Sequence, residues 1–417
     1  MKPLSRYHTG IGYDIIKRMP LCEKDVTAML GTSAVIFVPD DTAKTGLPQP
    51  LMLQNVLGAP LLAWLANTLL EDGVARFFLI CREEFTAETL ACMPEEAEVA
   101  VTRDSNPSDL LHVFLSTAEE SERDVTVVAG PAVWLPSLAR RSGSPVPACV
   151  FRAGREALMG ALDEQGSLSH FLKANCAVLS DYDGFYTVDS VAAAMELAPM
   201  LRRDRILRLV RQGVEIFDAD RCDVEPSVRL EEGVRLLPGA ILRGNTIIRS
   251  KAIIGPWSLV EDSEVGEGAT VNASQVYRSK IAAGACVGPY AHLRDGAEIG
   301  RNVKIGNFVE IKNTRIGEGG FVSHLSYLGD ADVGENCNFG CGTATVNFDR
   351  VEKHRTTVEK DAFIGCHTAL VAPVTVGEGA YVAAGSVITE DVPANALAIG
   401  RARQSNKRDW ATKHKKP

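Results

Sequence analysis

The sequence predicts a two-part protein, an α/β domain followed by a parallel β-helix built from six-residue repeats. In the C-terminal half an aliphatic residue returns every six positions, with two slips to five and one interruption, and Gly or Ala often follows it. In the N-terminal half short apolar segments alternate with helix-like segments, which favours a parallel sheet. At 417 residues the chain is long enough for two or three domains.

The six-residue repeat fits neither an α-helix, which has 3.6 residues per turn, nor a simple alternating strand. It fits a β-helix, in which each hexad forms one side of a triangular coil and its aliphatic side chain stacks on the hexad about 18 residues away. The positions expected to point inward are Ile281, Val287, Leu293, Ile299, Ile305, Ile311, Ile316, Val322, Leu328, Val333, Phe339, Val358, Ile364, Leu370, Val376, Val382 and Ile388.

A polar stretch at residues 346–357 interrupts the repeat. A β-helix can eject such a stretch as a loop at a corner without disturbing the stack, and loops on a rigid scaffold often carry function. The basic segment that follows residue 400 is either a solvated tail or an arm that contacts an anionic ligand or a neighbouring subunit.

We expect four segments: residues 1–32 as an extension, 33–215 as the α/β domain with a linker helix, 216–400 as the β-helix, and 401–417 as the basic tail. The expected strands of the α/β domain are Ser33–Val38, Phe77–Cys81, Val99–Thr102 and Val125–Ala129. The expected helices are Leu61–Glu71 and Ser190–Gly213, the second of which ends at a glycine.

Composition excludes several classes of protein. The net charge of −9 argues against a general nucleic-acid binder, although a local Lys/Arg cluster can still hold a small anion. No apolar run approaches the length of a membrane-spanning helix, so we expect a cytoplasmic protein without a membrane partner. Ten cysteines without a Cys-x-x-Cys pair favour reduced thiols over a disulfide framework or a zinc site.

Motifs of the C-terminal half resemble, in order, the acetyltransferase domain of the bifunctional bacterial glucosamine-1-phosphate N-acetyltransferase/N-acetylglucosamine-1-phosphate uridylyltransferase family. These motifs lie at residues 288–294 (GPYAHLR), 306–312 (GNFVEIK), 324–330 (HLSYLGD), 334–338 (GENCN), 370–376 (LVAPVTV), 383–386 (AAGS) and 391–393 (DVP). The resemblance covers roughly residues 215–410. It implies a left-handed β-helix that assembles as a homotrimer, with active sites between subunits.

The resemblance also implies a reaction, in which the acetyl group of acetyl-CoA moves to the amine of glucosamine 1-phosphate. A sugar amine is largely protonated near neutral pH, so a group must accept its proton, and an imidazole with an ordinary pKa of about 6.5 is suited to this. His324 matches the general base of the family. Either Asp330 or a main-chain carbonyl is expected to orient its ring.

A sugar phosphate requires fixed cations, and Arg294 and Lys312 match the phosphate- and sugar-binding positions of the family. They lie three hexads apart, which in a triangular coil places one directly above the other. Three further positions match residues that contact the substrate: Tyr327, Asn338 and Lys353.

The positions that match acetyl-CoA contacts are Cys341, Asn347, Phe348, Cys366, Ala384 and Arg401. Three depart from the usual residue of the family, with Cys341 for Ala, Cys366 for Ser and Phe348 for Tyr. The main-chain N–H at Cys341 is expected to polarise the thioester carbonyl, so the substitution there is tolerable. Neither cysteine is expected to act as a nucleophile, and the acetyl transfer should require neither a metal site nor Mg²⁺.

In this family the N-terminal half is a Rossmann-like nucleotidyltransferase domain, and here its motifs are degenerate. The loop after the first strand, Pro39–Lys44, lacks the glycines and the arginine that would wrap a nucleotide, and it carries Asp40 and Asp41. Gln49 replaces a lysine, and Pro131 stands where a metal-binding aspartate is usual. We therefore expect the uridylyltransferase activity to be lost.

The sequence thus predicts a glucosamine-1-phosphate N-acetyltransferase whose product feeds UDP-N-acetylglucosamine and cell-wall precursor synthesis. Three alternatives stay open: an acetyltransferase for another amino sugar, a non-catalytic trimeric protein that binds a sugar phosphate or CoA, and a bifunctional enzyme with residual uridylyl transfer.

Overall fold

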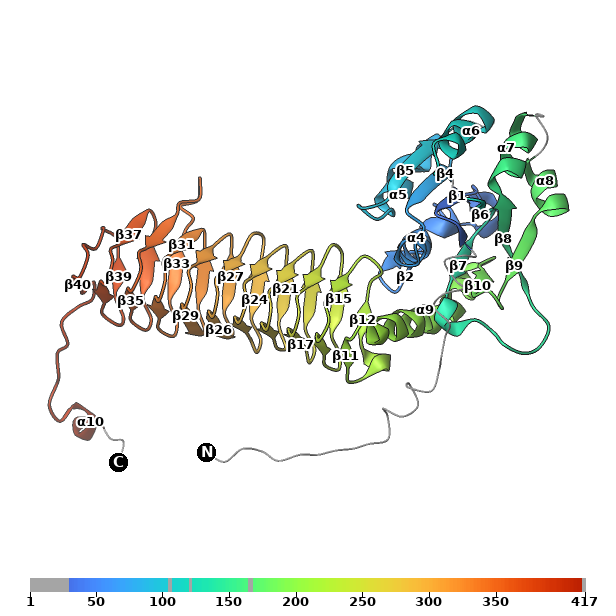
Figure 1. The fold of residues 1–417 in the computed structure, drawn as a ribbon. Helices are drawn as coiled ribbons and strands as arrows, with labels where there is room; N and C mark the ends of the chain where they lie inside the picture. The colour runs from blue at the N-terminus through green and yellow to red at the C-terminus, as the bar shows by residue number, and fades with distance from the viewer. Residues whose placement is uncertain (1–29, 104–106, 120–121, 164–167, 415–417) are drawn as a thin grey trace. The chain divides into compact units, whose positions relative to one another are not determined.

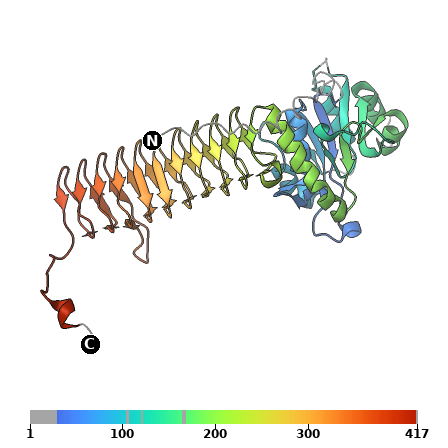
Figure 2. The same ribbon diagram turned by 90° about the horizontal axis from the view of Figure 1, so that it is seen from below.

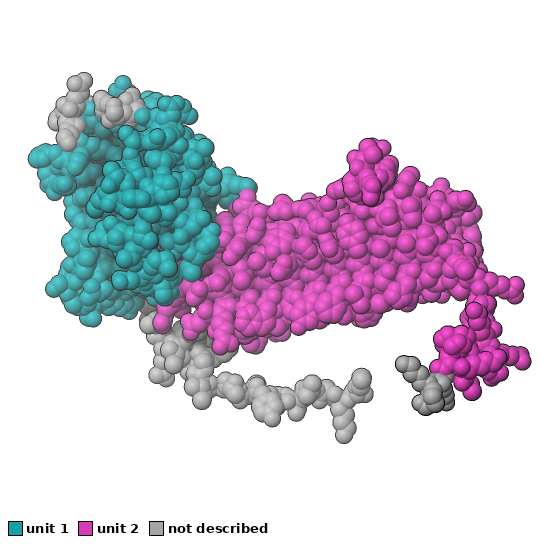
Figure 3. Space-filling view, turned by 180° about the vertical axis from the view of Figure 1, so that it is seen from behind, with its two compact units in different colours: residues 1–200 teal, residues 201–417 magenta. Residues whose placement is uncertain are grey.

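The computed structural model describes residues 30–103, 107–119, 122–163 and 168–414, and the chain forms two compact units, residues 1–200 and 201–417 (Figure 3). The expected N-terminal extension therefore lies almost wholly outside the described residues. The second unit begins before residue 216 because Ile206 and Leu209, from the helix expected as a linker, pack in the β-helix core. None of the helices in the described ranges is long and apolar enough to cross a membrane.

The first unit is built on a six-stranded sheet with the order β5-β4-β1-β6-β8-β9. The four expected strands are all present and parallel to one another: β1 Ser33–Phe37, β4 Arg76–Ile80, β5 Glu98–Thr102 and β6 Asp124–Val128. The sheet as a whole is mixed, because β8 (Pro147–Gly154) and β9 (Ala177–Ser180), which the sequence did not predict, add two antiparallel pairings. Two short antiparallel pairs complete the strands: β2 Asn55–Val56 with β3 Ala59–Pro60, and β7 Ala132–Trp134 with β10 Phe185–Thr187.

Helices separate the strands of this unit. The helix α4 (Leu61–Glu71) has the expected bounds, and α9 (Val191–Arg211) corresponds to the expected linker helix. The other α-helices in the described residues of the unit are α3 Thr42–Thr45, α5 Thr86–Ala91, α6 Ser108–Ser116, α7 Arg155–Asp163 and α8 Leu168–Asn175.

The second unit is a left-handed parallel β-helix whose coils stack along one axis (Figure 1). Its three faces are three parallel sheets, which we call face 1, face 2 and face 3. Face 1 contains β11 Glu215–Ile216, β14 Arg235–Leu236, β17 Ile253–Ile254, β20 Thr270–Val271, β23 Cys286–Val287, β26 Lys304–Asn307, β29 Phe321–His324, β32 Asn338–Phe339, β35 Phe363–Ile364, β38 Tyr381–Val382 and β40 Leu397–Ala398.

Face 2 contains β12 Asp223–Val224, β15 Ile241–Arg243, β18 Leu259–Glu261, β21 Gln275–Tyr277, β24 His292–Arg294, β27 Glu310–Lys312, β30 Tyr327–Gly329, β33 Ala344–Val346, β36 Ala369–Val371 and β39 Val387–Ile388. Face 3 contains β13 Arg229–Leu230, β16 Ile247–Ile248, β19 Glu264–Val265, β22 Lys280–Ile281, β25 Glu298–Ile299, β28 Arg315–Ile316, β31 Ala331–Val333, β34 Thr356–Val358 and β37 Val374–Val376. A short helix, α10 (Trp410–Lys413), lies in the tail.

The predicted inward positions are confirmed, since every one of them is buried. On face 2, for example, Leu293 pairs with Ile311 and Ile311 pairs with Leu328. Each aliphatic side chain therefore packs on the equivalent side chains of the coils before and after it. The hydrophobic effect thus acts along the whole axis, with each coil contributing to its neighbours.

The interruption of the repeat is an ejected loop, residues 347–355, between β33 and β34. It projects from the stack (Figure 2), and the register on either side of it continues: β31 pairs with β34, and β33 pairs with β36. The coils therefore keep their alignment across the insertion, as the sequence predicted.

Close stacking of the coils leaves no room for a side chain at Gly306. A Cβ atom at this position would lie 1.9 Å from the carbonyl oxygen of Ser323 in the next coil. We predict that Gly306→Ala lowers the free energy of unfolding by about 1–3 kcal/mol, because the coils must separate to admit the methyl group.

The matched control for this substitution is Gly160→Ala, in helix α7, where a Cβ atom meets nothing within 4 Å. This change should stabilise the protein by about 0.5–1 kcal/mol, since alanine is the better helix former. Urea unfolding followed by circular dichroism measures both effects. An unaltered unfolding midpoint for Gly306→Ala would contradict the tight stacking of the coils.

Candidate active site

Arg294 and Lys312 lie one directly above the other on face 2, as their spacing predicted. Arg294 ends β24, Lys312 ends β27, and the two are register partners. Their neighbours Leu293 and Ile311 point into the core, so the two cations point outward by strand alternation. Both residues are half-buried at the surface of the coil.

The two cations differ in their partners. The Nε of Arg294 donates to Glu310 Oε1 at 2.7 Å, and its Nη1 lies 3.2 Å from Asp295 Oδ2. The hydrogen bond to Glu310 raises the pKa of the guanidinium above its ordinary value. Within the described ranges no carboxylate lies at ion-pair distance from Lys312. Lys312 therefore has the less compensated charge of the two.

A second ammonium group, that of Lys353, lies next to Lys312. It comes from the ejected loop, where residues 348 and 353 pair as an antiparallel bridge. Contact with Lys312 lowers the pKa of Lys353, while Asp330 and Tyr327 act in the opposite direction. Two like charges held this close favour an anion between them. The structure therefore brings together the predicted residues Lys312, Tyr327 and Lys353.

Asp330 is a buried carboxylate that ties three successive coils together. Its backbone has a φ of 50°, a left-handed conformation that aspartate tolerates better than most residues. Its two side-chain oxygens accept hydrogen bonds from the amide groups of Asn313, one coil before, and of Asn347, one coil after. Asn347, predicted to contact acetyl-CoA, thus has its side-chain N–H directed to Asp330 at the base of the loop.

His324 ends β29 on face 1, and its ring is oriented by Asn307. The ring Nδ1 lies 2.6 Å from Asn307 Oδ1, one coil before it. Because an amide oxygen can only accept, this contact favours a proton on Nδ1, and in the neutral ring Nε2 then keeps its lone pair. The expectation that Asp330 or a main-chain carbonyl orients the ring is wrong, since the side-chain oxygens of Asp330 accept from two asparagines at a different corner.

Asn307 is a candidate site residue that the sequence did not predict. It lies inside the motif at residues 306–312, one coil before His324. In a β-helix whose coils each contain three hexads, with occasional slips to five, this spacing makes the two positions register partners. The signal was therefore present in the same count that paired the two cations.

His324 heads a column of predicted acetyl-CoA residues. On face 1 four strand residues are register partners from coil to coil: Phe321, Asn338, Phe363 and Tyr381. The residue three positions after each of them belongs to the column. The column itself consists of His324, Cys341, Cys366 and Ala384. Cys341 is half-buried, Cys366 is exposed, and neither forms a disulfide.

Asn338 and Phe348 lie outside this column, whereas the Cδ of Arg401 lies 3.6 Å from the place of a Cβ atom at Gly385, the residue after Ala384. Asn338 projects from face 1, whereas Arg294 and Lys312 project from face 2, so one copy of the chain does not bring them onto one surface. Phe348 is exposed on the ejected loop, and Arg401 is exposed in the tail after the last coil.

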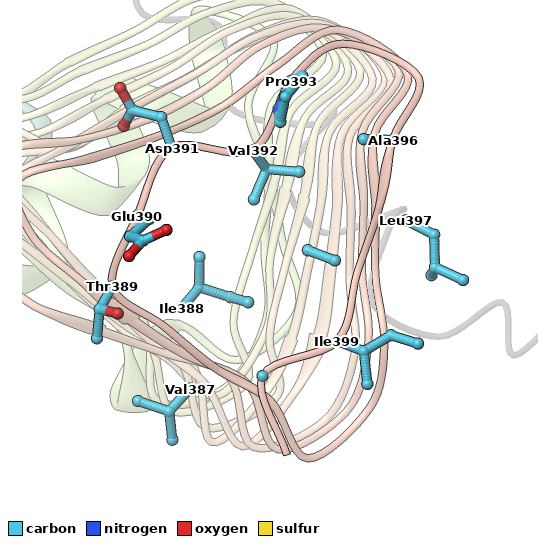
Figure 4. A pocket seen from close by; sticks show the side chains of 12 residues that line it. Val387, Ile388, Thr389, Glu390, Asp391, Val392, Pro393, Ala396, Leu397 and Ile399 are labelled. Carbon is cyan, nitrogen blue, oxygen red and sulfur yellow. The ribbon is translucent and has the colours of Figure 1, made fainter. Parts of the chain in front are cut away.

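A hollow of about 260 Å³ lies at the open end of the last coil, lined by residues 387–393 and 396–400 (Figure 4). Its walls are mostly apolar, with Glu390 and Asp391 at the rim. None of the predicted site residues lines it. It is therefore the uncovered end of the β-helix core and separate from the cations and the histidine.

In the first unit, the loop after β1 is held by its own side chains. Asp40 forms an ion pair with Arg82, and Thr42 Oγ1 donates to Asp40 Oδ1 at 2.6 Å. Hydrogen bonds from Thr42 lower the pKa of Asp40 below its ordinary value. The Oδ1 of Asp41 accepts the main-chain N–H of Leu51 at 2.9 Å. Both carboxylates thus have partners within the protein.

Pro131 lies shortly after β6 in the chain, at the position where members of the family usually have an acidic metal ligand. Its carbonyl oxygen accepts the main-chain N–H of Val188 at 2.8 Å. The thiol of Cys149 also donates to this oxygen, at 3.4 Å. In the described part of the chain no three His, Cys, Asp or Glu side chains lie close enough together to hold a metal ion.

Comparison with known proteins connects this geometry to a family. Residues 278–313 match the bacterial transferase hexapeptide (six repeats) model. The chain is 50% identical over 204 residues to the bifunctional protein GlmU of Brevibacillus brevis, covering 49% of this chain and 44% of that protein. It is 43% identical over 244 residues to the bifunctional protein GlmU of a Geobacillus species, covering 57% of this chain and 53% of that protein.

These matches confirm the resemblance that the motifs predicted. The chain spans about half the length of the relatives it matches. Among solved structures, the UDP-N-acetylglucosamine acyltransferase of Francisella novicida is 14% identical with a TM-score of 0.36, over 44% of this chain and 66% of that one.

Proposed function

We propose that the protein transfers the acetyl group of acetyl-CoA to the amine of glucosamine 1-phosphate, giving N-acetylglucosamine 1-phosphate and CoA. The observation that carries the proposal is the histidine at the corner of faces 1 and 2. Its Nδ1 is occupied by Asn307 at 2.6 Å, so Nε2 is left as a base, and Tyr327 and Lys312 belong to the same and the preceding coil. The similarity to GlmU proteins supports the same reaction.

In the proposed reaction the sugar nitrogen attacks the carbonyl carbon of the thioester, and a new C–N bond forms. As it forms, His324 Nε2 accepts a proton from the nitrogen. The main-chain N–H of Cys341 donates to the carbonyl oxygen while that oxygen carries negative charge. The C–S bond then breaks, the thiolate of CoA leaves, and the imidazolium returns the proton to sulfur. No covalent bond to the protein is needed.

The phosphate of the sugar is assigned to the cations of face 2. A phosphate dianion between Lys312 and Lys353 would relieve the repulsion that lowers the pKa of Lys353. The planar guanidinium of Arg294 can also donate to the phosphate, either while it keeps its hydrogen bond to Glu310 or after the phosphate replaces Glu310 as acceptor. The phosphate thus positions the sugar, and the histidine acts on its amine.

We predict that His324→Ala lowers kcat for acetyl transfer by about 10²–10⁴-fold, because the proton of the attacking amine then has no acceptor. The KM for both substrates should change little, since the imidazole acts on the transition state. Release of the CoA thiol, followed with a thiol reagent in the presence of glucosamine 1-phosphate, measures both constants. Retention of full activity in this variant would remove His324 from the mechanism.

We also propose that the active form is a homotrimer in which face 1 of one copy completes the site on face 2 of the next. The support is the separation of Asn338 from Lys312 on two faces of the same β-helix. A sugar bound by both therefore requires a second copy.

Subunit mixing tests this arrangement. We predict that Lys312→Ala and Asn338→Ala are each poorly active alone, and that co-expression of the two restores activity. Over all trimers that assemble at random from equal amounts of the two variants, about a quarter of the sites combine an intact face 1 with an intact face 2. If the mixture is no more active than either variant alone, the site lies within one copy.

We further propose that the first unit has lost uridylyl transfer. The loop that would cradle a triphosphate carries Asp40 and Asp41 beside Lys44, and the nearby Arg82 is already paired with Asp40. Pro131 offers no side chain for Mg²⁺ at the expected metal position.

We predict that UTP and N-acetylglucosamine 1-phosphate with Mg²⁺ give no enzyme-dependent pyrophosphate. A preparation that is active in acetyl transfer serves as the control for correct folding. Pyrophosphate release above the rate without protein would show that the altered residues still support the reaction.

A further inference from the structure

The ejected loop at residues 347–355 is held closed by one carboxylate. Asp349 Oδ2 lies 2.8 Å from His354 Nε2. Its other oxygen accepts the main-chain N–H groups of Val351 and Glu352, each at 2.8 Å. The main-chain N–H of His354 donates to the carbonyl of Asn347 at 2.9 Å. Asp349 therefore joins the two sides of the hairpin and caps its tip.

The contact between Asp349 and His354 affects the position of Lys353, the residue before His354 in the chain. Lys353 lies next to Lys312, and two like charges at close range repel each other. The loop is exposed, with Val351 87% accessible at its tip, so packing does not hold it down. Asp330 offsets part of this repulsion, and the position of Lys353 over face 2 depends in addition on the shape of the hairpin. The contact between Asp349 and His354 is placed to set that shape, because it closes the hairpin immediately next to Lys353.

We propose that Asp349 and His354 are positioning residues that hold Lys353 beside Lys312, so that the anion-binding site is assembled before the substrate arrives. Neither residue touches the reacting atoms; both act through Lys353. The inference rests on the proposed function, in which this pair of cations receives the phosphate of the sugar.

The charges around the loop give the arrangement a pH dependence. Asp349 and Glu352 are the charged groups that act on His354, and the hydrogen bond to Asp349 is the main reason that the pKa of His354 lies above its ordinary value. The same contact holds the pKa of Asp349 well below its usual range. The closed loop is thus stabilised while His354 is protonated. That stabilisation is fully present below the ordinary pKa of histidine and is lost as the pH rises through the raised pKa.

Lys353 responds in the same direction. The groups that face it are Lys312 on β27, Tyr327 on β30 and Asp330 at the following corner. Since contact with Lys312 lowers the pKa of Lys353, its charge is lost at a lower pH than that of an ordinary lysine. Affinity for a phosphate should therefore fall on the alkaline side in two steps, the first set by His354 and the second by Lys353.

Three variants separate positioning from a general effect on the fold. His354→Ala removes the contact, and His354→Gln keeps a neutral N–H donor toward Asp349. Glu352→Gln is the matched control, because it removes a charge from the same loop and keeps the main-chain N–H that caps Asp349.

We expect His354→Ala to raise the KM for glucosamine 1-phosphate by about fivefold, with kcat and the KM for acetyl-CoA within about twofold of the original chain. His354→Gln should recover much of this loss and abolish the first alkaline step in the pH profile of kcat/KM. Glu352→Gln should keep the KM of the original chain, with the first alkaline step still present and moved to a slightly lower pH because the charge of Glu352 also raises the pKa of His354. A KM for the sugar phosphate that is unaltered in His354→Ala, or a first alkaline step that persists in His354→Gln, would overturn the proposal.

Limited trypsin digestion measures how accessible the loop is to cleavage, independently of acetyl transfer. Cleavage after Arg350 and Lys353 should be several-fold faster in His354→Ala than in the original chain or in Glu352→Gln. Equal rates would show that the contact does not hold the loop closed. If the original chain transfers no acetyl group to glucosamine 1-phosphate, the proposed function fails, and digestion still decides whether Asp349 and His354 close the hairpin.

Discussion

The alignment of one coil on the next is the constraint on which the whole β-helix depends. Inward side chains such as Leu293, Ile311 and Leu328 stack because burying them removes apolar surface from water, and the hydrogen bonds between coils then fix the register. Once the register is set, every outward side chain also belongs to a column. Chemistry on this scaffold is therefore a matter of which residues share a column and which columns meet at a corner.

The electrostatics of face 2 follow from that geometry. Stacking places the main chains of Arg294 and Lys312 about 4.8 Å apart, which is the spacing of neighbouring strands in a sheet. The ejected loop adds a third cation, Lys353. Glu310 compensates Arg294, whereas the two lysines face each other. The repulsion between the two lysines raises the electrostatic energy of the empty site, and a bound dianion replaces this repulsion with attraction to both. The buried carboxylate of Asp330 anchors the base of the loop, so the third cation rests on a rigid support.

Much of this could be read from the sequence, for physical reasons that differ between elements. The inward residues were predictable because each hexad must bury one apolar side chain, a local signal repeated many times. The stacked cations followed from the same count. The same count also makes Asn307 the register partner of His324, but an uncharged asparagine does not by itself indicate that it orients a ring in the next coil, so it was missed. The antiparallel pairings of β8 and β9 were missed because an apolar segment carries no information about its direction in a sheet. The contact of Asp349 with His354 depends on the path of an irregular loop, which periodicity does not describe.

The open end of the last coil is the place where two β-helices could associate end to end. A β-helix has no geometric stop, so its final coil exposes main-chain groups that could template the strand of another molecule. Here that rim carries Glu390, Asp391 and Pro393 around an apolar hollow. Carboxylates resist burial without partners, and proline cannot donate to a ladder. End-to-end growth into a filament is thereby disfavoured by the same coil that terminates the core.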